Sequence, residues 1–83
     1  MYVKDLKVTR YLGSKDIAAL TNLARNYESD IKLQCRHYKI DVKSILGLLA
    51  LSLDKGTEIT IITKGDDDKE ALQAICEFLQ TDA

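Results

Sequence analysis

The sequence predicts an α+β domain in which a four-stranded, largely antiparallel sheet is covered on one face by three helices, an open-faced β-sandwich. Three observations lead to this prediction. Several short runs alternate apolar and polar residues, which is the period of a strand with one solvent-exposed face. Other runs repeat apolar residues every three or four positions, as amphipathic helices do. The runs follow one another in the order strand, helix, strand, strand, helix, strand, helix.

Length and composition restrict the class of protein. The 83 residues are expected to form a single domain over residues 1–83, since they leave no room for a second core. Twelve basic and 13 acidic residues give a net charge of −1, whereas nucleic-acid-binding proteins normally carry a basic excess. We recognise neither a membrane-spanning segment nor a signal peptide. With two cysteines and no export signal, the expected location is the reducing cytoplasm.

The first two elements are a strand and a helix. Residues 2–9 alternate with the period of a strand, and Gly13 then breaks the chain. Ser14 is the expected N-cap of a helix over residues 15–27, because its hydroxyl can accept a hydrogen bond from an unpaired N–H of the first turn. The apolar stripe of this helix consists of Ile17, Leu20, Leu23, Ala24 and Tyr27.

Two alternating runs follow, at residues 31–35 and 38–42. They are expected to form a hairpin joined through Arg36 and His37. The junction lacks the Asn-Gly or Asp-Gly pair that tight hairpin turns prefer, so the turn type stays open.

Residues 43–56 are predicted to form a short helix. Ser44 is placed to cap its first turn, and Gly56 lies where positive φ is easily adopted. The apolar side chains surround the helix axis, yet the segment is too short to span a membrane and the domain too small to bury it completely. One side is therefore expected to face the core, and the other to form an exposed apolar patch beside Ser44, which suggests a docking surface. The apolar residues are Ile45, Leu46, Leu48, Leu49, Leu51 and Leu53.

The final strand and helix have strong local signals. Residues 57–63 are rich in β-branched side chains, which favour strands. The acidic run of residues 66–68 precedes the last helix, and Asp67 with Glu70 is expected to form a capping box there. This run lacks the ligand spacing of an EF-hand, so no calcium site is expected. The buried stripe of the helix should contain Leu72, Ile75, Cys76 and Leu79, and Cys35 and Cys76 are expected to be small core residues.

Several segments resemble one known family. Leu6-Lys7-Val8-Thr9 is similar to the first strand of the histidine-containing phosphocarrier protein (HPr) of the bacterial sugar phosphotransferase system. Lys43-Ser44-Ile45-Leu46-Gly47, followed by residues 54–61, resembles the regulatory-serine helix and fourth strand of that family. Gly65 and Ala71-Leu72 fall where the family begins its last helix. The resemblance covers nearly the whole chain and implies the same open-faced sandwich.

The chain departs from this family after the first strand. There the family has a glycine, one further residue and then His-Ala-Arg-Pro, whose histidine accepts phosphate on a ring nitrogen. The corresponding segment here is Gly13-Ser14-Lys15-Asp16-Ile17-Ala18, which is shorter and contains no histidine. Neither Ser14 nor Asp16 is equivalent to a nucleophilic imidazole, and Lys15 supplies only a positive charge. The comparison implies that this chain is not a phosphocarrier, and we expect no enzymatic activity.

The candidate site is centred on Ser44. The residues alone predict a helix N-cap, and the resemblance implies a second role as the acceptor of a regulatory phosphate from a serine kinase; the two roles are compatible. Ile45, Leu46, Leu49 and Lys15 are the expected partner contacts, with the alternative that the helix is rotated so that its three apolar residues are buried. The implied partners are proteins, namely a serine kinase and a transcription regulator or transport component.

The function expected from these features is that of a non-catalytic, HPr-like regulatory or adaptor protein. No cofactor or metal is expected, because the single histidine, His37, lies at a predicted exposed turn without neighbouring ligands. One alternative is a phosphocarrier with an atypical acceptor at His37, Asp16 or Lys15. Another is a small α+β domain that self-associates through the helix patch.

Overall fold

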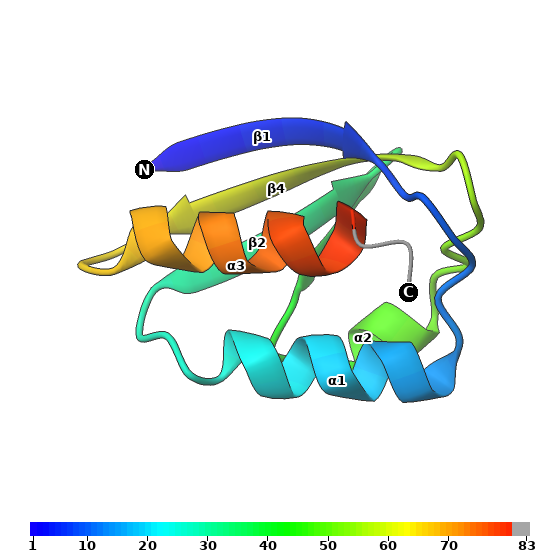
Figure 1. Cartoon of the computed structure of the whole chain (residues 1–83), viewed down its shortest axis with the longest axis horizontal. Helices are drawn as coiled ribbons and strands as arrows, with labels where there is room; N and C mark the ends of the chain where they lie inside the picture. The colour runs from blue at the N-terminus through cyan, green and yellow to red at the C-terminus, as the bar shows by residue number, and fades with distance from the viewer. Residues whose placement is uncertain (81–83) are drawn as a thin grey trace.

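The computed structural model describes residues 1–80 and shows the predicted order of elements (Figure 1). Four strands form one open sheet, and three helices lie against it. The predicted fold class is thereby confirmed. The elements are β1 (Tyr2–Lys7), α1 (Ser14–Ala24), β2 (Asp30–Cys35), β3 (Tyr38–Asp41), α2 (Ile45–Leu49), β4 (Glu58–Lys64) and α3 (Asp68–Gln80).

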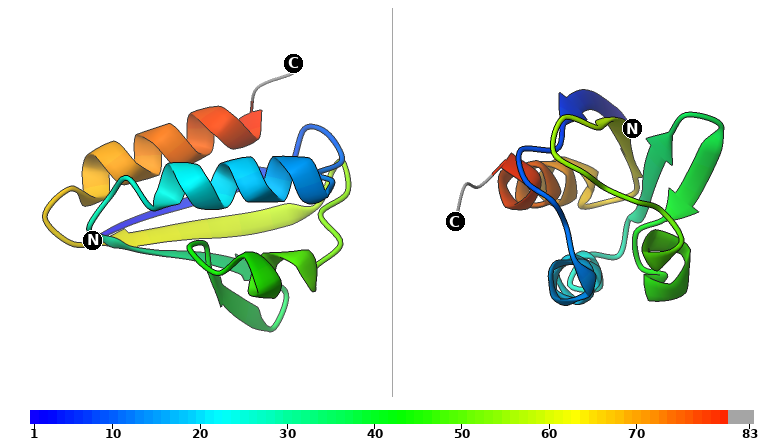
Figure 2. Two further views of the ribbon diagram at one scale, coloured as in Figure 1. Left: turned by 90° about the horizontal axis from the view of Figure 1, so that it is seen from below. Right: turned by 90° about the vertical axis from the view of Figure 1, so that its right-hand side faces the viewer.

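The sheet has the strand order β1-β4-β2-β3, and all neighbouring strands are antiparallel. The β-branched strand β4 is central, where residues with stiff side chains pack well on both neighbours. Its Ile59 lies opposite Leu6 of β1, and its Ile61 lies opposite Leu33 of β2. All four side chains are buried on the face that the helices cover, and the alternate residues point to the open face (Figure 2).

The core lies between the sheet and the helices. α1 packs against both α2 and α3, and α3 also packs on β1, β2 and β4. Each helix inserts a fully buried leucine or isoleucine into this space, as the periodic stripes predict. The largest fully buried apolar residues are Leu20, Ile31, Leu33, Leu48, Leu53, Ile61, Ile75 and Leu79. None of the helices within residues 1–80 has the length and hydropathy needed to cross a membrane.

The ends of α1 differ from the prediction. The N-cap is Gly13, not Ser14, and the Gly13 N–H donates to the carboxylate Oδ2 of Asp16 (3.3 Å). An acidic residue at this third helical position can therefore satisfy the N-cap amide itself. The helix ends at Ala24 instead of residue 27. Asn26 and Tyr27 donate to carbonyls three residues earlier, so the last turn is tightened.

α2 is much shorter than the predicted segment, because the helix stops at Leu49. The chain then leaves as a loop in which Leu53 is fully buried. The carbonyl of Leu53 accepts a hydrogen bond from the Leu12 N–H (3.0 Å), which ties the loop to the segment before α1. As predicted, Gly56 has positive φ (90°).

The predicted hairpin between β2 and β3 is confirmed, with Cys35 paired to Tyr38 and a two-residue turn between them. Arg36 has a φ of 58°, whereas His37 is not in the positive-φ region. These signs match a type II′ turn, in which the first central residue is usually glycine.

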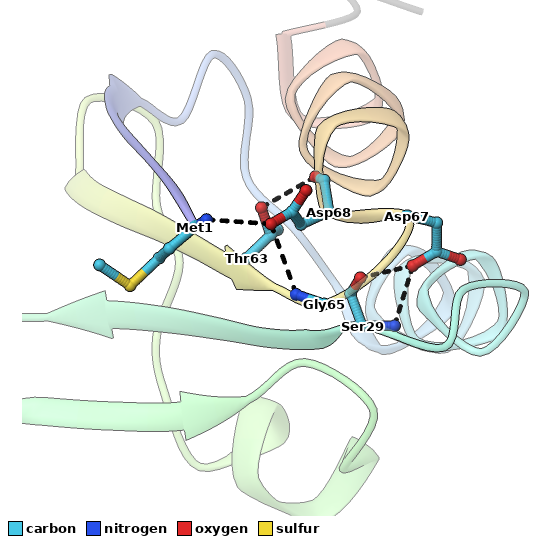
Figure 3. A network of polar contacts seen from close by, with 6 residues as sticks. All are labelled: Met1, Ser29, Thr63, Gly65, Asp67 and Asp68. Carbon is cyan, nitrogen blue, oxygen red and sulfur yellow. Dashed lines mark hydrogen bonds and ion pairs between the residues drawn. The ribbon is translucent and has the colours of Figure 1, made fainter.

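The predicted capping box at the start of α3 is wrong, because the Asp67 carboxylate has other partners. It accepts hydrogen bonds from Glu28 N (2.9 Å), Ser29 N (2.9 Å) and Ser29 Oγ (2.5 Å). The neighbouring Asp68 accepts from Gly65 N (3.4 Å) and pairs with the Met1 α-ammonium (3.1 Å) (Figure 3).

Candidate functional site

Ser44 is the N-cap of α2, as the sequence predicts. Its backbone is extended (φ −103°, ψ 103°), and its Oγ accepts a hydrogen bond from Gly47 N (3.4 Å). Its carbonyl accepts from Leu48 N (3.2 Å), which begins the helical pattern. The residue is exposed, so the hydroxyl combines a capping role with access from solvent.

Two basic side chains hold the segment that leads into Ser44. The Lys43 ammonium donates to the carbonyl of Tyr27 (2.6 Å), and the Arg25 guanidinium donates to the carbonyl of Lys43 (3.4 Å). The Lys43 N–H donates to the Asp41 carboxylate (2.9 Å), as in a turn stabilised by an aspartate. Ser44 therefore follows a segment that is held by hydrogen bonds from two basic side chains and to one carboxylate.

A close backbone contact fixes the rotation of α2 about its axis. A Cβ added at Gly47 would lie 2.7 Å from Cγ2 of Ile40, so only glycine allows this approach of α2 to β3. In this orientation Leu48 points into the core and is fully buried.

The same orientation leaves leucines on the opposite side of α2. Leu46 is 79% exposed and Leu49 is 46% exposed, which agrees with the predicted half-covered helix. Ile45 differs, because it is partly buried and packs against the core cluster. We call the exposed set of Ser44, Leu46 and Leu49 the α2 surface. Ile45 borders this surface with the part of its side chain that stays accessible.

Lys15 and Tyr11 lie near the N-terminal end of α1. Lys15 is exposed in the first turn of α1, and α2 lies beside the first half of α1 in the views of Figures 1 and 2. Tyr11, which the sequence analysis did not select, is 64% exposed in the loop before α1. The sequence offers one signal for Tyr11, namely that an aromatic residue stands in a stretch without strand or helix periodicity.

Comparisons with known proteins identify the family of this chain. Residues 9–81 match the family described as the PTS HPr component phosphorylation site. The chain belongs to the HPr family. One HPr-family relative, the HPr-like protein Crh of Bacillus subtilis (strain 168), is 32% identical over 76 residues, which are 92% of this chain and 89% of the relative.

Solved structures from the HPr family have the same fold. The phosphocarrier protein HPr of Bacillus anthracis str. Ames has a TM-score of 0.90 at 30% identity and covers 95% of this chain, with 96% of its own length matched. The crystal structure of Bacillus subtilis Crh has a TM-score of 0.78 at 35% identity, over 90% of this chain and 84% of that chain.

At the start of α1, in the segment that the HPr resemblance singles out, the Asp16 carboxylate has two partners within the chain. Asp16 Oδ2 accepts from Gly13 N, and Asp16 Oδ1 lies 3.1 Å from the Arg10 guanidinium. Arg10 also lies over the ring of Phe78, with its Cζ 5.7 Å from the ring centroid. A carboxylate of the chain itself therefore occupies the N-terminal end of α1.

His37 and the two cysteines lie outside the α2 surface. His37 is exposed in the β2–β3 turn, as predicted, and belongs to a different segment from Lys15 and Asp16. Cys35 is buried, whereas Cys76 is half-buried and burial raises the pKa of its thiol. No cluster of metal-ligating side chains occurs within residues 1–80.

Proposed function

We propose that this protein is an HPr-like regulatory or adaptor protein that lacks histidine phosphocarrier activity and binds a protein partner through the α2 surface. The exposure of Leu46 (79%), two residues after the exposed Ser44, carries the proposal, because an exposed apolar side chain beside an accessible hydroxyl suits a regulated docking surface. The similarity to Crh, which is described as an HPr-like catabolite repression protein, supports a regulatory role.

The first turn of α1 supports the absence of carrier activity. A histidine phosphocarrier needs a neutral ring nitrogen as nucleophile and nearby donors for the incoming phosphoryl oxygens. Ser14, Lys15 and Asp16 provide no ring nitrogen, and Asp16 already accepts from the N-cap amide of α1.

We propose further that phosphate on Ser44 regulates partner binding. A phosphoserine carries roughly −1.5 to −2 charges at neutral pH and three acceptor oxygens. The Lys43 and Arg25 cations flank the preceding peptide, so the added charge would be partly compensated within the domain. Because Ser44 lies next to Leu46, a phosphate there would change the charge at the edge of the apolar contact.

The phosphoacceptor role is tested with a purified HPr-family serine kinase and ATP, followed by intact-mass measurement. The wild type should gain one phosphate, and Ser44→Ala should gain none. Ser52→Ala, which removes another exposed serine after α2, is the matched control and should be modified like the wild type. An unmodified wild type, or equal addition to Ser44→Ala, would remove the switch from the proposal.

The docking role is tested with a photo-crosslinking amino acid at position 46 or, as a control, at position 3. Val3 is 57% exposed on β1, outside the α2 surface. A partner isolated through position 46 and not through position 3 is then purified for binding measurements. Leu46→Asp should weaken its affinity at least tenfold, whereas Val3→Asp should leave it within twofold. Equal effects of the two substitutions would contradict docking through α2.

Self-association is a second candidate, because solved structures of relatives include a dimer of Crh and a dimer of HPr from Thermoanaerobacter tengcongensis. Sedimentation velocity of the wild type and of Leu46→Asp distinguishes the two proposals. A dimer that Leu46→Asp dissociates would favour self-association through the α2 surface, and a monomeric wild type would exclude it.

A further inference from the structure

A groove of about 590 Å³ lies at one end of the sheet, where β1 and β2 end and β4 begins. The groove is open to solvent and has both polar and apolar groups in its lining. Its polar lining comes from residues that alternate with the buried Leu6 and Ile59, so it opens on the face of the sheet that carries no helix (Figure 2). The groove is therefore separate from the α2 surface.

The acidic groups of the groove already have partners. Asp5 Oδ1 accepts a hydrogen bond from Thr60 Oγ1 (2.6 Å). Glu58 Oε1 lies 3.8 Å from the Lys7 ammonium. These contacts leave Arg36 as the charged side chain of the lining that has no hydrogen bond or ion pair to any residue from 1 to 80.

Arg36 is also an unusual residue for its position. Its φ of 58° belongs to the left-handed region, which non-glycine residues adopt at a cost in conformational energy. Glycine would form the same turn without this strain. Arginine therefore occupies this position at an energetic cost that glycine would avoid.

We infer that this groove binds a small carboxylate-bearing ligand through the guanidinium of Arg36, with the exposed amide of Gln34 as a second donor. The planar guanidinium matches a carboxylate with two parallel hydrogen bonds. Gln34 lies two residues before Arg36 along the chain and lines the same groove. The nearby charges of Asp5 and Glu58 disfavour a dianionic phosphate more than a singly charged carboxylate.

The ligand class is tested by NMR titration of the ¹⁵N-labelled protein at constant ionic strength. Acetate and L-glutamate should give saturable shifts at the amides of residues 34–37 and 58–60, and inorganic phosphate should bind at least threefold more weakly than acetate. A hexaglutamate peptide should bind no more tightly per carboxylate than glutamate. Stronger phosphate binding, tighter peptide binding or shifts at every basic residue would overturn the inference.

Three variants separate the guanidinium from the fold and from net charge. Arg36→Gly removes the side chain at a position that glycine tolerates, and it should abolish the saturable shifts. Arg36→Lys retains the positive charge without the planar guanidinium and should weaken the affinity for acetate at least threefold. Lys64→Gln, which removes one exposed positive charge at the opposite end of β4, should bind like the wild type. Unchanged binding by Arg36→Gly would also overturn the inference.

Discussion

At the scale of single residues, two buried threonines differ in how their hydroxyls are used. Thr21 in α1 is 2% exposed, and its Oγ1 has no hydrogen-bond partner within residues 1–80. Thr63 in β4 is fully buried, and its Oγ1 donates to the carbonyl of Asp68 (2.9 Å). An unsatisfied buried hydroxyl costs about 1–3 kcal/mol, whereas a satisfied one contributes roughly 1 kcal/mol. The two sites should therefore respond oppositely to the same substitution.

Valine has nearly the shape of threonine without the hydroxyl, so it isolates this effect. We expect Thr21→Val to raise the free energy of unfolding by about 1 kcal/mol, since it removes an unpaired polar group. Thr63→Val should lower it by about 1 kcal/mol, because the carbonyl of Asp68 loses its donor. Urea denaturation at neutral pH measures both. A loss of stability in Thr21→Val would show that its hydroxyl is satisfied in solution.

At the scale of elements, the Asp67 carboxylate joins the start of α3 to the loop between α1 and β2 (Figure 3). The Ser29 hydroxyl and then the Glu28 N–H stabilise the charged form, and they lower the pKa of Asp67 below its ordinary value of 3.8. The segments are 38 residues apart in the sequence, so one side chain closes a long loop.

Because folding lowers the pKa of Asp67, its charged carboxylate stabilises the folded state. This contribution is complete when the pH is above the unfolded-state pKa of 3.8, and it is lost as the pH falls through the folded-state pKa. We expect Asp67→Asn to reduce the fall in melting temperature between pH 6 and pH 3. Asp68, whose pKa is also lowered, retains its own contribution in this variant. Asp66→Asn, at an exposed position beside Asp67, should leave the fall unchanged. An equal fall in wild type and Asp67→Asn would contradict the clamp.

Sequence periodicity predicted the order and type of the elements because strand and helix patterns are local. The length of α2 was not predictable, since Leu51 and Leu53 continue an apolar run that a helix or a buried loop can equally explain. The contact that decides between them joins Leu53 to Leu12, far along the chain. The role of Asp67 was missed for the same reason, because its partners lie in another loop.

The candidate site shows the same division between local and distant causes. The cap at Ser44 depends on Gly47, three residues away, and was read directly from the sequence. The difference between exposed Leu46 and partly buried Ile45 depends on the rotation of α2. The approach of Gly47 to Ile40 of β3 sets that rotation, and no local pattern contains it.

At the scale of the whole molecule, one small core supports two separate exposed surfaces. The helix side carries the α2 surface, and the open face of the sheet carries the groove beside Arg36. With 83 residues, a stability of roughly 4–12 kcal/mol is expected. Such a domain tolerates few defects in its core. Binding residues are therefore expected on the surface, where a substitution changes the free energy of unfolding little.

Two leucine truncations test this separation. Leu20 is fully buried where α1 meets the core, so Leu20→Ala should lower the free energy of unfolding by about 2–5 kcal/mol. Leu46 is 79% exposed, so Leu46→Ala should change it by less than about 0.5 kcal/mol. Urea denaturation compares both with the wild type. A loss near 2 kcal/mol in Leu46→Ala would place this side chain in the core in solution, and the apolar contact beside Ser44 would then be unavailable to a partner.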